Sequence, residues 1–348
     1  MKITSIQKQN FKGYDAAPIK NLYLSVLEAN DERDLFDDIQ NVAKREGIGL
    51  WTITGDRLFE GREPETWVGR YPADIWTQDR IFFTEGNGCT QVHPAKSLLG
   101  IHHGISNDFE VKNKIKTSDT FLSTDCGNFF VGKKENGEKY VLAGAESISD
   151  ARKIAELQNI KKENIHIIPQ PAFHIDMIVR PIGFPYILVH DEDLALENVD
   201  KLNTTNEIKA RLKKEITKDR ENILRGRKFI SGKELAKKLE AQGFKPILIG
   251  GLYGVNVNFM NAIVHKRNDG NLVYITNGSE NLSREKTQLQ KIFEQDLRAK
   301  VSNIAKVDFI LGEKAKITGD NAIGDLLMFY QGGVHCLAAE EPDFEKWV

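Results

Sequence analysis

The sequence lacks the features of a secreted, disulfide-bonded or membrane-spanning protein. Only three cysteines occur in 348 residues, Cys89, Cys126 and Cys336, and no two of them form a CxxC pair. An odd and scattered set argues against a disulfide framework or a cysteine zinc site, and favours a reducing compartment. The first ten residues contain no apolar core of a Sec signal, and no apolar run reaches the ~18 residues that span a bilayer. We therefore expect a cytoplasmic protein without a membrane partner, although export by a route other than Sec stays open.

The sequence also lacks an excess of charge of either sign. Lys and Arg number 48 and Asp and Glu number 50, which leaves a formal charge of −2 at pH 7. Proteins that bind nucleic acid through their overall charge carry a basic excess, so we expect no nucleic-acid partner. A chain of this length, 40% hydrophobic, buries a substantial core without a stabilising metal ion. We expect neither a cofactor nor a metal ion.

One segment shows an order of strand, strand, helix, strand. Strands are expected at residues 128–131 and 140–143, joined through Asn136-Gly137, because Asn-Gly supplies the positive φ angles of a tight hairpin. A helix is expected from Ser149 and a further strand at residues 165–168.

A second segment repeats the same order. Strands are expected at residues 257–264 and 272–276 around Asp269-Gly270, followed by a helix from Ser283 and a strand at residues 307–311. Fragments of the pattern recur elsewhere, including a capping box at Ser231 before another helix and strand. The repetition indicates an α/β protein of ββαβ modules that pack together, and we expect one domain over residues 1–348.

A highly charged segment interrupts this scheme. Residues 201–228 are rich in Lys, Arg and Glu, with Ile208, Leu212 and Ile216 at steps of four. This spacing predicts an exposed amphipathic helix inserted among the modules. A solvated cap is the favoured interpretation, and a lid or a partner-binding surface is the alternative.

Four side chains together suggest a reaction, although each alone is more often structural. Cys336 follows two glycines in a Gly-Gly-Val-His-Cys segment that resembles a strand. His174 and Asp176 are two residues apart, so on a strand they would share a face. Asp79 follows Trp76, and a carboxylate beside a tryptophan can hold a planar cation by charge and stacking.

A guanidinium group explains the presence of two carboxylates, since it presents paired N–H groups to bidentate acceptors. We expect Asp79 and Asp176 to clamp it while Cys336 attacks its central carbon. His174 would protonate the departing ammonia and activate the water that hydrolyses the thiouronium. A thiol is mostly protonated at neutral pH, and a cationic substrate favours its ionisation.

This ordered set of motifs resembles the pentein, or guanidino-group-modifying, superfamily, which includes arginine, agmatine and protein-arginine deiminases and amidinotransferases. The resemblance implies a five-bladed α/β propeller of ββαβ modules, here with a charged helical insertion. It implies that Cys336 is the nucleophile and that His174 and Asp176 are the HxD pair. It also implies that Asp79 binds the guanidinium and that Trp76 stacks on the substrate.

Further residues near these motifs have expected roles. Asp125 stands where small-molecule deiminases carry a glutamate that supports the histidine, although the acid here is one methylene shorter. A residue at a turn or strand end is the alternative for Asp125. We expect His335 to point to the opposite face of a strand from the nucleophile and to be structural. Asn258 and Asn261 are expected to satisfy backbone groups near the site.

The motifs divide between two substrate classes. Trp-Thr-Gln-Asp at residues 76–79 and Cys-Gly-Asn at residues 126–128 are similar to protein-arginine deiminases, whereas the nucleophile segment and the following Glu-Glu-Pro are similar to agmatine deiminases. We predict a guanidine deiminase, a hydrolase that forms a ureido group and ammonia, most similar to peptidyl-arginine deiminases. A deiminase of agmatine or another small guanidino compound, an amidinotransferase and a non-catalytic arginine-binding protein remain alternatives. A homo-oligomer is compatible with the sequence.

Overall fold

The computed structural model describes residues 16–26, 33–54, 81–84, 88–92, 117–122, 126–170, 174–222, 230–253, 257–278, 284–310 and 333–347. The strands of these residues form five three-stranded sheets, and all five have the same plan. The middle strand pairs antiparallel with one neighbour and parallel with the other. This repetition agrees with the repeated modules expected from the sequence.

The sheets are β15 (Ala338–Pro342), β1 (Ile19–Val26) and β2 (Gly49–Thr54); β3 (Ile81–Thr84), β4 (Gly88–Val92) and β5 (Thr117–Leu122); β6 (Phe129–Lys133), β7 (Lys139–Gly144) and β8 (Ile165–Ile168); β9 (Val179–Gly183), β10 (Tyr186–His190) and β11 (Lys245–Ile249); and β12 (Ala262–Lys266), β13 (Leu272–Asn277) and β14 (Ile304–Ile310).

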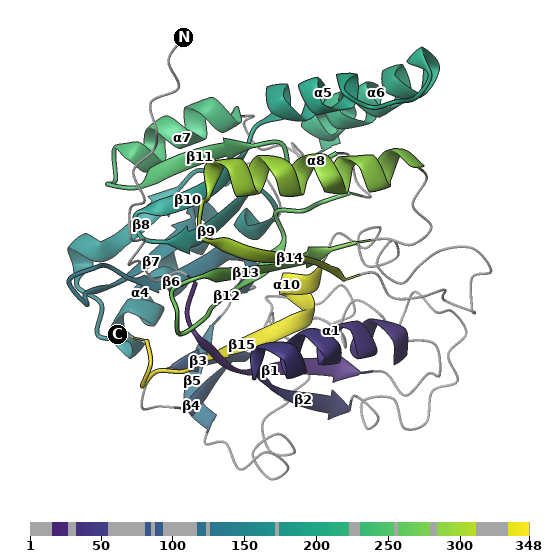
Figure 1. The fold of residues 1–348 in the computed structure, drawn as a ribbon. Helices are drawn as coiled ribbons and strands as arrows, with labels where there is room; N and C mark the ends of the chain where they lie inside the picture. Colours follow the sequence, from purple (N-terminus) through teal and green to yellow (C-terminus); the bar gives the residue numbers. More distant parts are fainter. Residues whose placement is uncertain are drawn as a thin grey trace, which may run out of the picture.

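Helices connect the strands of four parallel pairs, β1–β2, β7–β8, β10–β11 and β13–β14, because a parallel pair needs a long crossover. They are α1 (Arg33–Glu46) before β2, α4 (Ile148–Leu157) before β8, α5 (Glu192–Asp200), α6 (Asn206–Asn222) and α7 (Gly232–Glu240) before β11, and α8 (Arg284–Lys300) before β14 (Figure 1). The two ββαβ segments expected from the sequence are thereby confirmed. Their hairpin turns contain Gly137 and Gly270 with φ of 82° and 83°, which glycine adopts without strain.

One expected strand is shorter than the sequence pattern indicated. A strand was expected over residues 257–264, but β12 begins only at Ala262. The Asn258 side chain accepts hydrogen bonds from the backbone N–H groups of Met260 and Asn261 at 2.7 and 3.2 Å. This local turn competes with sheet pairing and ends the extended conformation. It also brings Asn261 toward the interior.

The capping box at the start of α7 is present as expected. The Glu234 backbone N–H donates to Ser231 Oγ at 3.3 Å, and the Ser231 backbone N–H donates to Glu234 Oε2 at 3.1 Å. Both bonds satisfy amide groups that the first turn of a helix leaves without partners.

The helix expected in the charged segment is α6. Its Ile216 is buried and its Leu212 is partly buried, and both pack against the hydrophobic cluster that contains Leu289 and Phe293 of α8. The apolar stripe therefore joins the core, while the charged residues cover it. That the segment is an insertion, and that residues 1–348 form one domain, both stay predictions.

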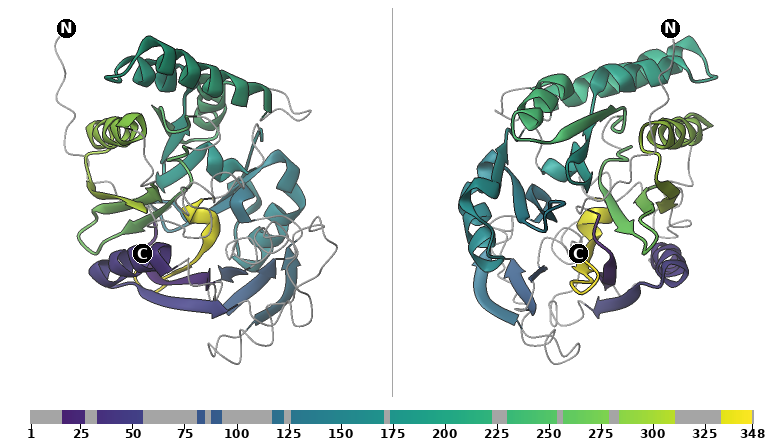
Figure 2. Two further views of the ribbon diagram at one scale, coloured as in Figure 1. Left: turned by 90° about the vertical axis from the view of Figure 1, so that its right-hand side faces the viewer. Right: turned by 60° about the vertical axis from the view of Figure 1, so that its left-hand side comes forward.

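The sheets surround the segment that carries α10 (Val334–Leu337) and the start of β15, drawn in yellow in Figure 2. This segment crosses the interior, and Val334, Cys336, Ala338 and Ala339 are each at most 1% exposed. The candidate nucleophile is thus carried to the middle of the molecule, where residues from several sheets can reach it.

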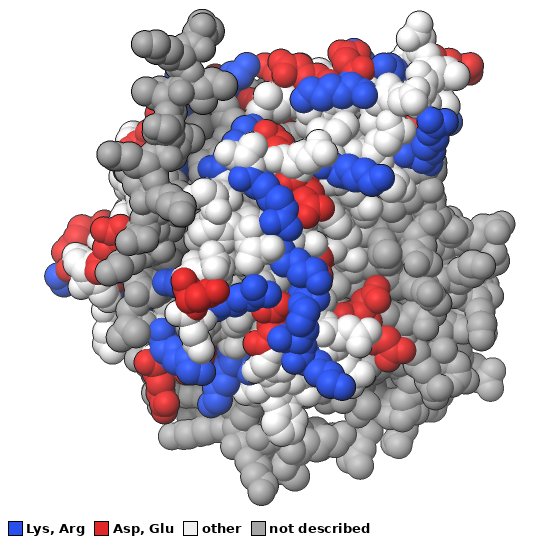
Figure 3. Space-filling model, in the orientation of Figure 1, with Lys and Arg blue, Asp and Glu red and all other residues white. Residues whose placement is uncertain are grey.

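No helix among the residues that the structure describes is long and apolar enough to cross a membrane. On the face shown in Figure 3, Lys and Arg side chains form a band down the middle, with Asp and Glu side chains beside it. The band lies over α8, β14 and α1, which carry the ion pairs Arg298–Glu294, Lys306–Asp308 and Arg45–Asp308. The basic groups of this band are therefore partly neutralised by neighbouring carboxylates.

Candidate active site

His174 and Asp176 lie at the start of a short 3₁₀ helix, η5 (Ile175–Met177), and not on a strand as expected. His174 itself is extended, and its carbonyl oxygen accepts a hydrogen bond from the Met177 backbone N–H at 3.4 Å. The Asn258 side chain holds this turn by donating to the Met177 carbonyl oxygen at 3.2 Å. The turn still places the imidazole beside the carboxylate. The expected proximity of the two groups is therefore correct, but the expected strand conformation of their backbone is wrong.

Cys336 lies on the four-residue helix α10, where the sequence suggested a strand. Two asparagines explain the helical turn. Asn277 Oδ1 accepts the Val334 backbone N–H at 2.8 Å, and Asn261 Oδ1 accepts the His335 backbone N–H at 2.9 Å. These bonds satisfy two of the amide groups that the start of a helix leaves without intrahelical partners.

The turn requires a glycine immediately before it. A Cβ atom on Gly333 would lie 2.5 Å from Asn261 Oδ1 and 2.6 Å from Asn277 Nδ2. Since real Cβ atoms do not approach other atoms so closely, only glycine allows both asparagines to reach the backbone of α10.

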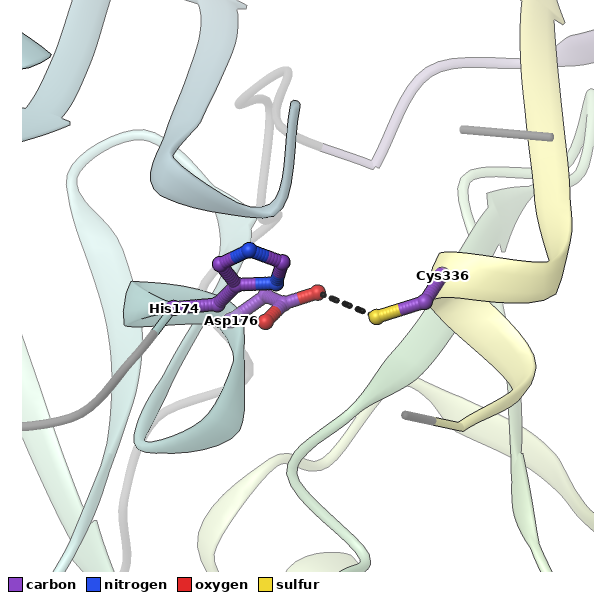
Figure 4. A group of neighbouring side chains, drawn as sticks. All are labelled: His174, Asp176 and Cys336. Carbon is purple, nitrogen blue, oxygen red and sulfur yellow. Dashed lines mark hydrogen bonds between the residues drawn. The ribbon is translucent and has the colours of Figure 1, made fainter. Parts of the chain in front are cut away.

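The three described side chains of the predicted catalytic set converge. Cys336 Sγ lies 3.4 Å from Asp176 Oδ2, and potential ligand atoms of His174, Asp176 and Cys336 all lie within 4.8 Å of one another. Figure 4 shows the sulfur and the carboxylate pointing toward each other, with the imidazole of His174 beside the carboxylate. The residues are 0–2% exposed. The structure therefore brings these three residues together, and their catalytic roles stay predictions.

The two oxygens of Asp176 have different surroundings. Oδ2 accepts hydrogen bonds from Asn261 Nδ2 at 2.8 Å, from His335 Nδ1 at 2.7 Å and from the Cys336 thiol. Oδ1 is buried and has no hydrogen-bond partner among the described residues. A buried oxygen of this kind costs free energy unless a donor binds it. Oδ1 is therefore suited to an N–H group of a ligand.

His335 belongs to the site, and the expectation that it points away from the nucleophile's face is wrong. On a strand, neighbouring side chains point to opposite faces, but on a helical turn they are only about 100° apart. The imidazole of His335 therefore reaches Asp176 Oδ2. On its other side, Nε2 lies 3.5 Å from Glu340 Oε1, and the same oxygen lies 3.3 Å from Arg180 Nη2.

The electrostatics favour an ionised Asp176 and a neutral His335. Burial alone would raise the pKa of Asp176, but the hydrogen bonds that it accepts from His335 and from the Cys336 thiol, together with the field of His174, lower it. Burial, reinforced by the charge of Arg180, lowers the pKa of His335. At neutral pH the Nδ1–H of a neutral imidazole therefore donates to a carboxylate, a tautomer assigned from this hydrogen bond.

The remaining predicted residues, Asp79, Trp76 and Asp125, lie outside the described residues, so their places in the site stay predictions. The sequence interpretation missed the contacts of His335 and Asn261 with Asp176. Asn258 and Asn261 were expected near the site, but only as partners of backbone groups.

The set of nitrogen, oxygen and sulfur donors in His174, Asp176 and Cys336 is of the kind that binds zinc. In this structure Asp176 Oδ2 and Cys336 Sγ already share a hydrogen bond. The same arrangement also suits a thiol nucleophile beside an acid–base pair.

No family model and no curated protein matches this chain. Among solved structures, the agmatine deiminase of C. jejuni aligns with a TM-score of 0.52 at 12% sequence identity, covering 97% of this chain and 99% of that chain. The chain has the fold of an agmatine deiminase. This is the pentein fold implied by its motifs. An arginine dihydrolase from cyanobacteria aligns with a TM-score of 0.45 at 11% identity, covering 92% of this chain and 39% of that chain.

The pentein fold accounts for the convergence of residues that are distant in sequence. Asp176 follows β8, Asn261 precedes β12 and Cys336 precedes β15, and these strands belong to three different sheets. Each residue lies in a short connection next to a strand and not within the sheet. The sheets therefore position the site, and their connections supply its chemistry.

Proposed function

We propose that the protein is a guanidine deiminase, which hydrolyses a guanidinium group to a ureido group and ammonium through a covalent intermediate on Cys336. The observation that supports this best is the buried contact between Cys336 Sγ and the Asp176 carboxylate, with His174 beside them. A carboxylate next to a thiol disfavours the thiolate in an empty site, but it binds a cationic substrate. The fold shared with an agmatine deiminase adds support.

The first half of the reaction forms the covalent intermediate. Asp176 Oδ1 accepts an N–H group of the guanidinium, and His174 takes the proton of the Cys336 thiol. The thiolate attacks the guanidinium carbon to form a C–S bond. The imidazolium then returns its proton to one amino group, the C–N bond breaks, and ammonia leaves a cationic thiouronium behind.

The second half consumes one water molecule. His174 accepts a proton from this water as its oxygen bonds to the thiouronium carbon. The C–S bond breaks, the sulfur regains a proton, and a ureido product is released. The ammonia of the first half takes up the remaining proton, so guanidinium and water give a ureido group and ammonium with charge conserved.

The residues outside the described part have roles in the same proposal. Asp79 would provide the second carboxylate of the guanidinium clamp, Trp76 would stack on the substrate, and Asp125 would support His174. We also propose that the five sheets are the five blades of the propeller that the family resemblance implies.

Within this activity, a small guanidino compound such as agmatine is the favoured substrate, ahead of the peptidyl-arginine preferred from the sequence. A solved structure that shares the fold is an agmatine deiminase. Peptide binding would also have to tolerate two acidic residues, four and five positions after the nucleophile. Glu340 pairs with Arg180, and Glu341 accepts hydrogen bonds from Asn21 and Tyr23 at 2.6 and 2.8 Å. Both acids thus serve internal contacts.

Incubation of the purified protein with agmatine, with free arginine and with an arginine-containing peptide tests the proposal. We expect ammonium and the ureido product in equal amounts, fastest from agmatine. The Cys336→Ala variant should bind agmatine but release no ammonium, since it lacks the nucleophile. Absence of ammonium from all three substrates, with a folded protein and a thiol that can be alkylated, would contradict deiminase activity.

The same incubation separates the alternatives. An amidinotransferase would transfer the amidino group to an added amine and form a new guanidino product. A non-catalytic binding protein would bind arginine or agmatine, and Cys336→Ala would change nothing but affinity. A preference for the peptide would restore the peptidyl-arginine hypothesis.

A further inference from the structure

The side chain of Asn261 contacts both the proposed nucleophile and the carboxylate that faces it. Its amide nitrogen Nδ2 lies 2.8 Å from Asp176 Oδ2 and 3.2 Å from Cys336 Sγ. Asn261 is fully buried. An amide nitrogen has two N–H groups, so one can donate to the carboxylate and the other to the sulfur.

The orientation of this amide is determined by its other contacts. Asn261 Oδ1 accepts the backbone N–H of His335 at 2.9 Å. A flipped amide would direct its NH₂ group at that N–H donor and leave both groups without an acceptor, so the hydrogen-bond network assigns Nδ2 to the side of the sulfur. The backbone is held as well, because the Asn261 N–H donates to Asn258 Oδ1 and the Asn261 carbonyl oxygen accepts from Asn277 Nδ2.

The charged groups around the sulfur explain why such a donor matters. On η5, Asp176 Oδ2 lies 3.4 Å from Cys336 Sγ, so the ionised carboxylate disfavours a negative charge on the sulfur. His174 lies beside the carboxylate. From α10 itself, the imidazole of His335 is directed at Asp176, with Nδ1 at 2.7 Å from Oδ2. The thiolate and the carboxylate must share one buried space, and a neutral donor bound to both lowers the cost of the arrangement.

We propose that Asn261 is a catalytic residue, whose side-chain amide stabilises the Cys336 thiolate next to the ionised Asp176. This inference deepens the proposed deiminase function, for which the thiolate is the attacking species. It assigns Asn261 two separable contacts. The carbonyl oxygen holds the turn of α10, and the amide nitrogen bears on the ionisation of the sulfur.

The test measures the ionisation of Cys336 without any substrate. The rate of alkylation by iodoacetamide, a neutral reagent that reacts with the thiolate, is followed as a function of pH. In Asn261→Asp the oxygen that holds the His335 N–H is kept and the donor to the sulfur is lost; in Asn261→Ala both are lost. We expect both variants to reach half of the limiting rate at higher pH. At pH 7 they should react about 10- to 100-fold more slowly, since a hydrogen bond to a charged group contributes about 1.5–3 kcal/mol.

Two features distinguish this role from a structural one. A change in access to the buried thiol would alter the limiting rate at high pH, whereas lost stabilisation of the thiolate moves the midpoint and leaves that limit unchanged. Asn198→Ala is the matched control, because Asn198 is also buried but its side chain bonds to Tyr253 and Lys201 and not to site residues. It should lower thermal stability and leave the alkylation profile unchanged.

An unchanged midpoint in Asn261→Asp would overturn the inference, as would a change in the limiting rate alone. If thermal unfolding shows that this variant is not folded, the same criterion applies to Asn261→Ala. The result is independent of turnover. A shifted midpoint in a protein that hydrolyses no guanidine would contradict the deiminase proposal alone, and normal hydrolysis with an unshifted midpoint would contradict only the role of Asn261.

Discussion

His335 fixes one oxygen of the carboxylate that faces the nucleophile. Its Nδ1–H donates to Asp176 Oδ2, and this hydrogen bond contributes to the lowered pKa of Asp176. With Oδ2 engaged by the protein, Oδ1 remains for the substrate. In the proposed reaction His335 would therefore be a positioning residue, which acts on the guanidinium only through Asp176.

Replacement of His335 should shift the acid limit of activity. In His335→Leu the carboxylate loses its strongest described donor, so the pKa of Asp176 rises and the carboxylate becomes protonated at higher pH than in the natural protein. We expect the acid limb of the pH profile of kcat/KM for agmatine to move to higher pH. At pH 7 kcat/KM should fall about 10- to 100-fold, the effect of a lost hydrogen bond to a charged group.

His335→Asn provides the control for this prediction. The amide nitrogen of asparagine can occupy nearly the position of Nδ1, so this variant should recover part of the activity and most of the original acid limb. A uniform loss of activity in both variants, with no movement of the limb, would show that His335 only fills space.

At the residue scale, the sequence allowed the proximity of Cys336, His174 and Asp176 to be predicted, because each belongs to a short motif with defined chemistry. His335 and Asn261 could not be placed in the same way. His335 reaches Asp176 only because α10 is a helical turn. That turn is held by hydrogen bonds from Val334 and His335 to the side chains of Asn277 and Asn261, which are far from it in sequence. Local patterns do not contain this information.

At the scale of the element, the connections that lead into and out of β6 make opposite demands on their glycines. Gly127 lies in the 3₁₀ turn η2 (Cys126–Asn128) before β6, where a Cβ atom would lie 2.5 Å from His174 Nδ1 and 3.2 Å from Asp176 Oδ1. Gly137 lies in the hairpin after β6, with open space around it but a φ of 82°. Gly127 is needed because its backbone lies close to the side chains of His174 and Asp176. Gly137 is needed because its φ angle is positive.

Alanine at the two positions should therefore separate activity from stability. Gly127→Ala pushes against the imidazole of His174, so we expect a large loss of kcat in the agmatine assay. Gly137→Ala should lower the free energy of unfolding by about 1 kcal/mol, because alanine is strained at positive φ, and leave kcat unchanged. Urea unfolding and initial rates measure the two effects. Full activity in Gly127→Ala would mean that His174 has room to move without consequence.

Element boundaries followed the sequence where a local signal defined them. The Asn-Gly and Asp-Gly turns and the capping box of Ser231 all lie where expected. Apart from β14, which begins three residues earlier than expected at Ile304, the errors lie near the site, in the late start of β12 and in the turns that carry Asp176 and Cys336. In each case side chains of Asn258, Asn261 or Asn277 bind backbone groups and replace the regular hydrogen bonding that apolar periodicity predicts.

At the scale of the whole molecule, a hydrogen-bond network around the Glu46 carboxylate joins α1, the end of β12 and β14. Glu46 ends α1 and accepts hydrogen bonds from Arg267, which follows β12, at 2.7 and 2.9 Å and from Arg45 at 2.6 Å. Arg45 also binds Asp308 of β14. The side chain of Glu46 is only 2% exposed. This network connects the sheet that contains β2 with the sheet of β12–β14, and periodicity alone gave no indication of it.

The network predicts a specific loss of stability in acid. The hydrogen bonds from Arg267, and then Arg45, lower the pKa of Glu46 to about 2 against the opposing effect of burial. Because the folded value is depressed, the contribution is complete above the unfolded pKa near 4.5 and disappears as pH falls toward 2. It amounts to about 3 kcal/mol at most, at about 1.4 kcal/mol for each pH unit. Glu46→Gln should lower the free energy of unfolding by up to this amount at pH 7, and by less than half of it at pH 3.

Glu138 provides the matched control for Glu46. Its hydrogen bond with Lys161, at 2.5 Å, also lowers its pKa to about 2, but the two side chains are 34% and 61% exposed. Solvent screens such a pair, so its contribution to stability is small. Glu138→Gln should therefore leave urea unfolding nearly unchanged at both pH values. Equal effects of the two substitutions would show that the Glu46 network does not tie the two sheets together, since burial is what distinguishes it from an ordinary surface ion pair.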